Sequence, residues 1–535
     1  MAGERKEENK KKRKKNLMVN KISKSLGIWR KKAKAWIGEN KGFSCLLLIM
    51  SVYYGWRMFA LDPWYDELYT YYSFISRGPV YAAIHWPVPN NHVFYSVLSG
   101  FLMIFGNPYI ALRGISWLFC VGNLIMLYTF AKRFFSRSLS LSCVAIYSSF
   151  YLVNYLSIQG RGYTLSTGLY LLALVMLYEI CVDKKAQFRY YAIFSLSLTG
   201  GLYAIPSNVY WVLPLCLAGG LYLLFSREIK TLLKLITASM VAAFNTFCLY
   251  SLIWLAIGSN LLSKTPDSGY FGIHQIKIIL TVPLAALKRG MDYMLASPYV
   301  QSIDREKVIR DFFSWTKGLL ELFSSTFGGV LLIILIVTVP LCIWGMIIGI
   351  KAGERKRLFL STYLISLLWG LPLILILQAV QPYYRVFTFL GVPLAVLLTV
   401  YLSQIKQKGW EMGILTVCLL WAAFWLSSPY YNGAYADRES KIKEIWKEAG
   451  ISEAESICFM DDYQRYVLKF YWNLQPSEAS LEEAQYILLP KEVISEDYEV
   501  NEWPVLYNHE GVNWEYLSAC QVIKETGEYI LYRKR

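Results

Sequence analysis

The sequence predicts a polytopic α-helical membrane protein with about eleven transmembrane helices and a small soluble α/β domain at its C-terminal end. Three observations support this fold class. The chain has 535 residues, of which 55% are hydrophobic and only 17% are charged, whereas soluble domains carry roughly a quarter charged residues. Its apolar residues gather in long runs, and its final segment is polar with short strand and helix patterns. Together these features indicate a chain that is mostly embedded in a bilayer.

The apolar runs are long enough to cross a bilayer core of about 30 Å. They cover residues 43–61, 111–131, 139–158, 163–180, 190–205, 210–225, 232–257, 327–350, 358–379, 386–401 and 412–426. The run at 92–105 has only 14 residues. A run of that length is typical of an interfacial or re-entrant segment, so we do not count it as a span.

The N-terminal tail is strongly basic and precedes the first run. Fifteen of the lysines and arginines lie within the first 42 residues, and the net charge of the chain is +16. Such a tail before a membrane span indicates a cytoplasmic anchor beside anionic lipid, and not a nucleic-acid-binding segment. The apolar run that starts at Phe43 is too long for a cleaved signal peptide, so we expect a signal anchor.

The positive-inside rule predicts the topology when 92–105 is left out as a span. The basic short loops then all fall on the cytoplasmic side: Lys132, Arg133 and Arg137; Lys184, Lys185 and Arg189; Arg227, Lys230 and Lys234; Lys351, Arg355, Lys356 and Arg357; Lys406 and Lys408. We therefore expect a multi-pass plasma-membrane protein with a cytoplasmic N-terminus. The predicted parts are a basic tail (1–42), a transmembrane domain (43–426) with outer loops at 62–110 and 258–326, and an extracytoplasmic α/β domain (427–535).

The C-terminal segment shows strand and helix patterns in alternation. SICFM at 456–460 and QYILLP at 485–490 are predicted strands, and 461–472 has helical spacing. Residues 520–534 predict a hairpin with Gly527 at its turn. Cys458 and Cys520 are the cysteines of this segment; we expect free thiols, and a disulfide between them stays open.

Ionisable side chains are costly at membrane depth and usually functional. In this chain such side chains, together with the polar amide of Gln159, gather at the predicted outer ends of the spans: Asp66, Glu67, His92, Arg113, Arg161 and Arg385. The convergence of four separate connections on one face predicts a single site at the outer mouth.

Each of these residues also has a simpler interpretation. Arg113 and Arg385 could be interfacial side chains that snorkel. Asp66 and Glu67 could cap a helix that begins after Pro63. The neighbouring tyrosines and tryptophan match an interfacial aromatic belt. The whole set in one place favours a site over these separate interpretations.

Arginines beside a carboxylate suit transfer from a phosphate-linked donor. A guanidinium matches the oxygens of a lipid-linked phosphate, and a carboxylate can take the proton of an acceptor hydroxyl. A phosphate leaving group needs cationic stabilisation, so one base and arginines suffice for a single displacement at a sugar carbon. A glycoside hydrolase would usually need two carboxylates.

At this point the ordered motifs resemble a known family. They are WYDELY at 64–69, NHVFYSVL at 91–98, ALRGISWLF at 111–119, AKRFFS at 131–136, SIQGRGYTL at 157–165 and PYYRVF at 382–387. The set is similar to the GT-C membrane glycosyltransferases, especially the family 39 branch with the aminoarabinose transferases and protein O-mannosyltransferases. The resemblance covers most of 43–165, and the middle third of the chain matches only in hydropathy.

The resemblance implies catalysis by Asp66 with Glu67 as its neighbour, and we expect both to be catalytic residues, although whether Glu67 assists, orients Asp66 or caps a helix stays open. The resemblance also implies a polyprenyl-phosphate-linked sugar donor. It implies a donor or acceptor site whose expected residues are Asn91, His92, Arg113, Gln159, Arg161, Tyr163, Tyr384 and Arg385. Many relatives have His-Pro-Pro where this chain has Asn90, Asn91 and His92, which leaves the role of His92 open. Some relatives hold a divalent metal with acids from two outer loops. Since SIQGRGY has no acid, we expect no metal and no other cofactor.

The leading hypothesis is thus a glycosyltransferase that transfers a hexose or pentose at the outer face. Its partners would be the lipid-linked donor, a glycan, lipid or protein acceptor, and membrane lipids, but no nucleic acid. Two alternatives stay open: a transporter or flippase of lipid-linked saccharides, and a membrane scaffold that presents the C-terminal domain. The scarcity of charges in the middle of the spans disfavours a transporter. The sequence identifies neither the sugar nor the acceptor.

Overall fold

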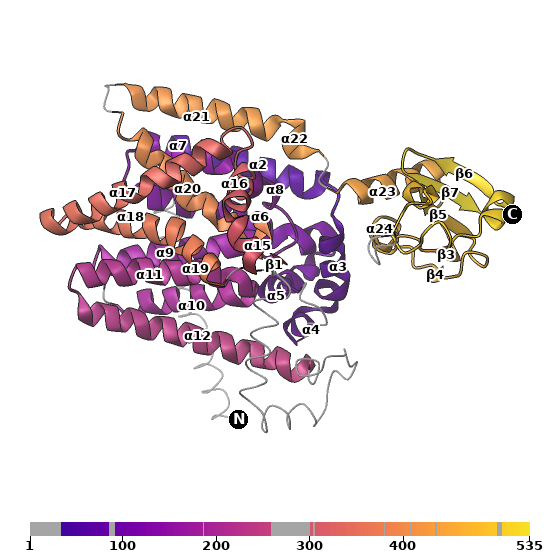
Figure 1. Ribbon diagram of the computed structural model, residues 1–535, viewed down its shortest axis with the longest axis horizontal. Coiled ribbons are helices and arrows are strands. Elements are labelled where there is room, and N and C mark those ends of the chain that lie inside the picture. The colour runs from indigo at the N-terminus through magenta and orange to yellow at the C-terminus, as the bar shows by residue number, and fades with distance from the viewer. Residues whose placement is uncertain are drawn as a thin grey trace, which may run out of the picture. The chain divides into compact units, whose positions relative to one another are not determined.

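The computed structural model describes residues 34–84, 91–185, 187–257, 300–302, 305–378, 380–405, 409–433, 436–499 and 505–535 (Figure 1). Several predictions concern residues outside these ranges: most of the basic tail, the outer loop from 258 to 299, and the loop residues Lys406 and Lys408.

Up to residue 433, the residues that the structure describes are almost entirely helical. Its helices are α2 Lys41–Ala60, α3 Tyr65–Ser73, α4 Pro79–Ile84, α5 Val93–Phe101, α6 Pro108–Ala131, α7 Arg137–Ser149, α8 Tyr151–Tyr155, α9 Tyr163–Cys181, α10 Phe188–Ala204, α11 Val209–Phe225, α12 Ile229–Ile257, α15 Arg305–Arg310, α16 Phe312–Glu321, α17 Gly328–Ala352, α18 Arg355–Ile365, α19 Leu371–Gln378, α20 Gly391–Leu402, α21 Trp410–Ser427 and α22 Pro429–Asn432. The short strands β1 Val300–Ser302 and β2 Gln381–Pro382 pair antiparallel.

Nine helices in the described residues are long and apolar enough to cross a membrane. Two further predicted spans form shorter elements: 139–158 is divided between α7, of 13 residues, and α8, and 190–205 forms α10, of 17 residues. The segment 92–105 forms the short apolar helix α5 and the 3₁₀ turn η2 Leu102–Phe105, as predicted. On α17 the large side chains of Val330, Ile333 and Ile336 are exposed, which suits a lipid environment.

The start of α6 illustrates how the sequence sets a helix boundary. The side chain of Asn107 accepts hydrogen bonds from the N–H groups of Tyr109 (2.9 Å) and Ile110 (3.2 Å), and Pro108 occupies the first helical position. Both features favour a helix N-terminus. Helix α6 then packs against α9, and α9 against α10. Arg113, in the second turn of α6, is fully buried.

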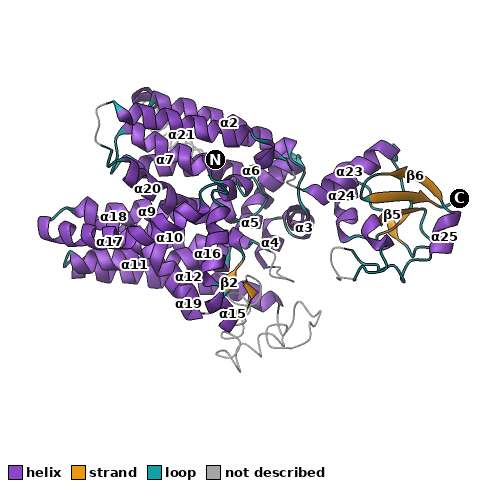
Figure 2. Cartoon of the chain, turned by 45° about the horizontal axis from the view of Figure 1, so that its top comes forward, coloured by secondary structure: helices purple, strands orange, loops and turns teal. Residues whose placement is uncertain are grey.

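The C-terminal domain contains a five-stranded sheet in the order β4-β3-β5-β7-β6, at the yellow end of the chain in Figure 1 and with the strands in orange in Figure 2. Strand β3 is parallel to β4 and β5, whereas β7 is antiparallel to β5 and β6. Its elements are α23 Asp437–Ala449, β3 Ser456–Cys458, α24 Asp462–Trp472, β4 Ser477–Glu478, β5 Tyr486–Pro490, α25 Trp514–Ala519, β6 Gln521–Glu525 and β7 Tyr529–Arg533. The predicted strands, helix and hairpin are confirmed, whereas α23 and α25 were not predicted.

Two apolar clusters stabilise this domain. One is formed by α23, α24 and the sheet, and it includes Ile442, Trp446 and Leu488. Leu68 of α3, which is far away in sequence, is fully buried in the same cluster. Cys458 and Cys520 are both free and buried. Leu68 therefore places part of α3 in the core of the C-terminal domain.

Candidate active site

Glu67 lies on the first turn of α3 and is fully buried. Its Oε1 accepts a hydrogen bond from Arg113 Nε and its Oε2 accepts one from Arg113 Nη2, each at 2.7 Å. The N–H of Gly160 donates to Oε1 at 2.5 Å, and the N–H of Trp64 donates to Oε2 at 3.2 Å. Glu67 thus joins α3, α6 and the loop before α9 at one point.

Arg113 is fully buried as well, so it does not snorkel. Its Nη1 donates to the carbonyl oxygens of Met58 (3.0 Å) and Leu61 (2.6 Å). Carbonyl groups at the end of a helix lack partners within the helix, and Arg113 supplies donors to those at the end of α2. Arg113 thus links α6, on which it lies, to α3 and to the end of α2.

Asp66, the neighbour of Glu67, points in a different direction, because successive residues of a helix are about 100° apart. Its side chain is 18% exposed, and its Oδ2 lies 3.3 Å from Arg385 Nη1 and 3.9 Å from Arg161 Nη2. A carboxylate and two guanidinium groups from three separate segments therefore converge at one place.

Arg161 also holds α3 in place. Its Nη1 donates to Thr70 Oγ1 at 2.6 Å and to the carbonyl oxygen of Asp66 at 3.3 Å. The side chain of Arg161 is only 3% exposed. The loop SIQGRGY therefore fixes the position of Asp66 through Arg161 and through the N–H of Gly160.

His92 lies next to Arg161 and is buried. Its Nδ1 accepts a hydrogen bond from the N–H of Gly162 at 2.8 Å, so in the neutral imidazole the proton is on Nε2. Burial lowers the pKa of His92 well below its usual range, and the nearby Arg161 and Arg385 lower the pKa further. Nε2 is 3.3 Å from Arg161 Nη2, which places two donors side by side. Such a pair suits an anionic oxygen.

The other predicted residues surround this centre. Tyr163 contacts the ring of His92, with 5.0 Å between centroids, and Tyr384 packs on Trp315 at 5.5 Å. Asn91 binds the local backbone through a 2.9 Å hydrogen bond from Nδ2 to the carbonyl of Ala82. Gln159 is fully buried, and neither atom of its side-chain amide has a hydrogen-bond partner in the described part of the chain.

Asp66 and Arg385 open into a cavity of about 720 Å³. It is rich in aromatic side chains and is lined by Trp64, Tyr65, Asp66, Tyr151, Leu152, Tyr155, Leu156, Leu322, Tyr383, Tyr384, Arg385, Ala436, Asp437, Arg438, Glu439 and Tyr463. Pockets of this size are typical of small-molecule sites. The lining comes from both the helical domain and the C-terminal domain.

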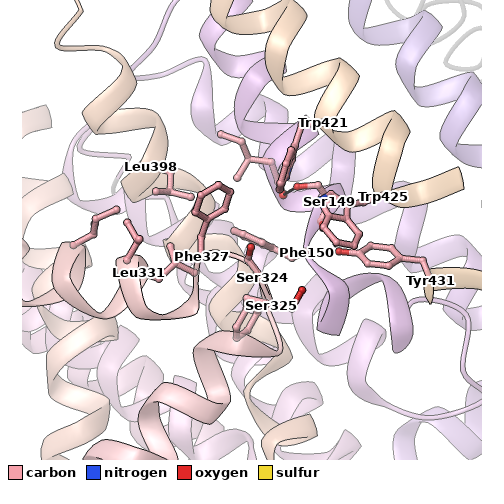
Figure 3. A pocket seen from close by; sticks show the side chains of 14 residues that line it. Ser149, Phe150, Ser324, Ser325, Phe327, Leu331, Leu398, Trp421, Trp425 and Tyr431 are labelled. Carbon is pink, nitrogen blue, oxygen red and sulfur yellow. Dashed lines mark hydrogen bonds between the residues drawn. The ribbon is translucent and has the colours of Figure 1, made fainter. Parts of the chain in front are cut away.

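A second, smaller cavity of about 260 Å³ is apolar (Figure 3). Its lining includes Phe150, Phe323, Leu331, Trp421 and Trp425. The two cavities are lined by residues that are adjacent in sequence: Phe150 and Phe323 line the apolar cavity, and Tyr151 and Leu322 line the cavity that contains Asp66. The N–H of Tyr151 donates to the carbonyl of Phe323 at 3.1 Å, and the N–H of Leu152 to that of Leu322 at 2.8 Å. This hydrogen-bonded seam contributes residues to both cavities.

Several residues in or around the site were not predicted from the sequence, among them Glu439, Tyr463 and Arg57. Glu439 and Tyr463 line the cavity from the C-terminal domain. Glu439 lies three residues before Ile442 and therefore on the apolar face of α23. A charged residue at an apolar position of a helix is a signal that could have identified it from the sequence. Arg57, at the end of an apolar run, is fully buried and donates to Asn154 Oδ1 at 2.5 Å.

The residues of this site do not fit a divalent metal. Asp66 faces two guanidinium groups, and Glu67 is engaged by Arg113. Within the described ranges, no group of three or more His, Cys, Asp or Glu side chains gathers that could hold an ion. The sequence-based expectation of transfer without a cofactor stays a prediction.

The chain was compared with known proteins. No family model matches it, and no curated sequence does either. Among solved structures it is similar to ArnT from Cupriavidus metallidurans bound to undecaprenyl phosphate, with 11% sequence identity, a TM-score of 0.57, and coverage of 93% of this chain and 98% of that one. The apo state of the same ArnT matches with 10% identity, a TM-score of 0.57, and coverage of 92% and 98%.

The archaeal oligosaccharyltransferase AglB from Archaeoglobus fulgidus also matches, but its TM-score of 0.42 is too low to carry an argument. The likeness to ArnT extends over nearly the whole of both chains, and at this identity it establishes the fold alone. The chain therefore shares the fold of ArnT, a polytopic helical membrane domain followed by a small C-terminal α/β domain, and this architecture agrees with the fold class that the sequence predicts.

Proposed function

We propose that this protein is an integral membrane glycosyltransferase. It moves a sugar from a polyprenyl-phosphate-linked donor to an acceptor hydroxyl on the extracytoplasmic face by a single displacement. The observation that carries the proposal is the position of Asp66 in an aromatic cavity, 3.3 Å from Arg385 and 3.9 Å from Arg161. The shared fold with ArnT, whose solved structure binds undecaprenyl phosphate, supports a lipid phosphate as the carrier.

Asp66 is the general base in this proposal. As the acceptor oxygen attacks the anomeric carbon, its proton passes to the carboxylate of Asp66. The bond between that carbon and the phosphate oxygen breaks, and polyprenyl phosphate leaves with the bonding electron pair. One displacement of this kind inverts the anomeric configuration. General-base assistance typically contributes about 10²- to 10⁴-fold to a rate.

Arg385 and Arg161 stabilise the charge that develops on the leaving phosphate. A guanidinium presents donors in a fork that matches phosphate oxygens, and donors already in place stabilise a transition state without reorganisation. The N–H at Nε2 of His92, next to Arg161, adds a neutral donor. The low pKa of His92 keeps this imidazole uncharged at neutral pH.

Glu67 has a positioning role in this proposal, in place of the catalytic role expected from the sequence. Its carboxylate is buried and accepts hydrogen bonds from Arg113, Gly160 and Trp64. A group engaged in this way is poorly placed to exchange a proton with a substrate. Glu67 and Arg113 fix the first turn of α3, which carries Asp66.

The apolar cavity offers a place for the isoprenoid chain of the donor. It lies across the seam of Tyr151 and Phe323 from the cavity that contains Asp66. A donor that spans the seam would place its chain among Phe327, Trp421 and Trp425, and its phosphate near Arg385. This arrangement separates the apolar and the charged ends of one substrate.

The test is mass analysis of cell-envelope glycans and lipids from cells with and without the gene. The proposal predicts a sugar substituent that disappears when the gene is deleted. The wild-type gene should restore it, the Asp66→Asn variant should not, and Asp497→Asn should, because Asp497 is an exposed acid of the C-terminal domain. Restoration by the Asp66→Asn variant would contradict the proposal.

A further inference from the structure

Helix α3, which carries Asp66, is held by the C-terminal domain along its whole length. Leu68 is buried in the apolar cluster of that domain. The ring of Tyr65 contacts Tyr463, with 4.8 Å between centroids, and Tyr466, at 5.6 Å. The hydroxyl of Tyr65 donates to Asp462. These contacts are far more extensive than a linker between two independent domains would need.

Asp62, three residues before the start of α3, is held in the same way. Asp62 Oδ1 accepts hydrogen bonds from Lys443 Nζ and from the hydroxyl of Tyr471, both at 2.6 Å, and its Oδ2 accepts one from Ser440 Oγ at 2.9 Å. Burial alone would raise the pKa of Asp62, but the hydrogen bonds from Lys443 and Tyr471 outweigh it and lower the pKa. The approach to α3 is therefore anchored to α23 and α24.

Glu439 of the C-terminal domain contacts the backbone next to Asp66. Its Oε1 accepts a hydrogen bond from the N–H of Tyr65, the first residue of α3. The N–H groups of the first helical turn have no partner within the helix, and this end of a helix attracts negative charge. Glu439 thus binds the backbone one residue before Asp66, and it does so from the C-terminal domain.

Burial of the Glu439 carboxylate is energetically unfavourable, which indicates a functional role for this residue. The residue is 3% exposed and still lines the cavity that contains Asp66 and Arg385. Burying a carboxylate without a cation is unfavourable. An apolar residue would continue the face formed by Ile442 and Trp446 at lower cost, but it could not accept the N–H of Tyr65.

We propose that Glu439 is a positioning residue for Asp66, and that the C-terminal domain completes the active site by fixing the first turn of α3 through it. The inference rests on the proposed function of Asp66. From the membrane domain, Arg113 and Arg161 hold α3. From the C-terminal domain, Glu439 holds its first N–H. Asp66 lies between these two sets of contacts, so loss of either set lets its carboxylate drift from the acceptor hydroxyl.

The test uses full-length protein in proteoliposomes, with a radiolabelled polyprenyl-phosphate sugar as donor and envelope extract from cells lacking the gene as acceptor. Glu439→Ala removes the acceptor oxygen, and we expect kcat to fall about 10- to 100-fold, the range that misplacement of a catalytic group produces, with KM for the donor unchanged. Glu439→Gln keeps an oxygen that can accept the N–H of Tyr65 and should retain kcat within about threefold of wild type. Glu444→Ala is the control, because Glu444 is an exposed acid of the same helix.

Glu439→Asp distinguishes the effect of side-chain length from the effect of charge. It keeps the carboxylate but is one methylene shorter, so we expect its kcat to fall about as far as the fall expected for Glu439→Ala. This variant also provides the test if Glu439→Ala does not fold. Wild-type activity of Glu439→Asp, or a defect of Glu439→Gln equal to that of Glu439→Asp, would overturn the inference. A change confined to KM would overturn it as well. If wild-type protein transfers no sugar at all, the proposed function fails instead, so the two failures are distinguishable.

Discussion

Glu67 and Arg113 form a two-armed ion pair with both side chains fully buried, with 2.7 Å between Arg113 Nε and Glu67 Oε1 and between Nη2 and Oε2. This pair sets the rotation of α3. With Glu67 turned inward, its neighbour Asp66 faces the cavity and the guanidinium of Arg385. Two adjacent acids thus have separate environments, one fully engaged by partners and one facing the cavity.

Arg113→Met should destabilise the protein strongly. It leaves the carboxylate of Glu67 buried without its cation, and breaking a buried pair in this way costs about 3–5 kcal/mol. We expect a lower midpoint of thermal unfolding in detergent and a lower yield of folded protein. Lys317→Met is the matched control, because it breaks an exposed pair with Glu321, which should cost only about 0.5 kcal/mol. Equal midpoints for the two variants would contradict the structural role of Arg113.

Gly160→Ala should abolish transfer or folding. A Cβ at this position would lie 2.3 Å from Leu112 Cδ1 and 3.0 Å from the carbonyl oxygen of Leu112, and the resulting shift would pull the N–H of Gly160 away from Glu67. Gly122→Ala is the control, since a Cβ there has nothing within 4 Å. In a helix this change is stabilising by up to about 1 kcal/mol. Activity of Gly160→Ala equal to that of Gly122→Ala would contradict the tight packing of the loop.

Glu439 should make stability depend on pH. The pKa of Glu439 is raised from 4.5 to about 7, chiefly by burial and in smaller part by the nearby carboxylates of Asp461 and Glu67, while the backbone N–H groups of Glu439 and Tyr65 oppose the shift. The folded state therefore binds more protons than the unfolded state between these values, so stability falls as pH rises from about 4.5 to about 7. The full shift corresponds to about 3 kcal/mol.

Glu439→Gln should remove this part of the pH dependence. Asp461, whose pKa is also raised by burial, remains in the variant and contributes in the same direction. We therefore expect a smaller drop in unfolding midpoint between pH 5 and pH 8 for Glu439→Gln than for wild type. A drop of the same size in both proteins would show that Glu439 does not titrate in this range.

Sugar transfer should not require a divalent metal. Asp66 is flanked by Arg385 and Arg161, and a dication beside two guanidinium groups would be repelled. We expect the initial rate to stay within about twofold of its untreated value after dialysis against EDTA, since no charge stabilisation by an ion is lost. A loss of activity that Mg²⁺ or Mn²⁺ restores would contradict this prediction.

Hydropathy and the positions of turn residues were enough to predict most of the fold. The long apolar runs and the polar strand patterns after residue 456 depend on local sequence, and the corresponding helices and strands are present. The run at 139–158 was read as one span because its apolar character is continuous. In the structure the helix is interrupted at Phe150, whose extended backbone ends α7 before α8 begins.

The site was only partly predictable. Asp66, Arg161 and Arg385 were identified because charges are rare near the apolar runs. The different orientations of Asp66 and Glu67 depend on which of them meets Arg113, and that is a tertiary contact. The place of Glu439 on the apolar face of α23 is unusual for an acid, but its contact with Tyr65 joins residues 374 positions apart. Only the folded chain reveals such a pair.

The most direct test of the central claim is the transfer rate of purified Asp66→Asn in proteoliposomes, with labelled polyprenyl-phosphate sugar and envelope acceptor. Asparagine keeps the size of the side chain but cannot take a proton from the acceptor hydroxyl. The rate should fall at least about 100-fold, with folding unchanged as judged by the unfolding midpoint. Transfer by Asp66→Asn at the wild-type rate would contradict the assignment of Asp66 as the base.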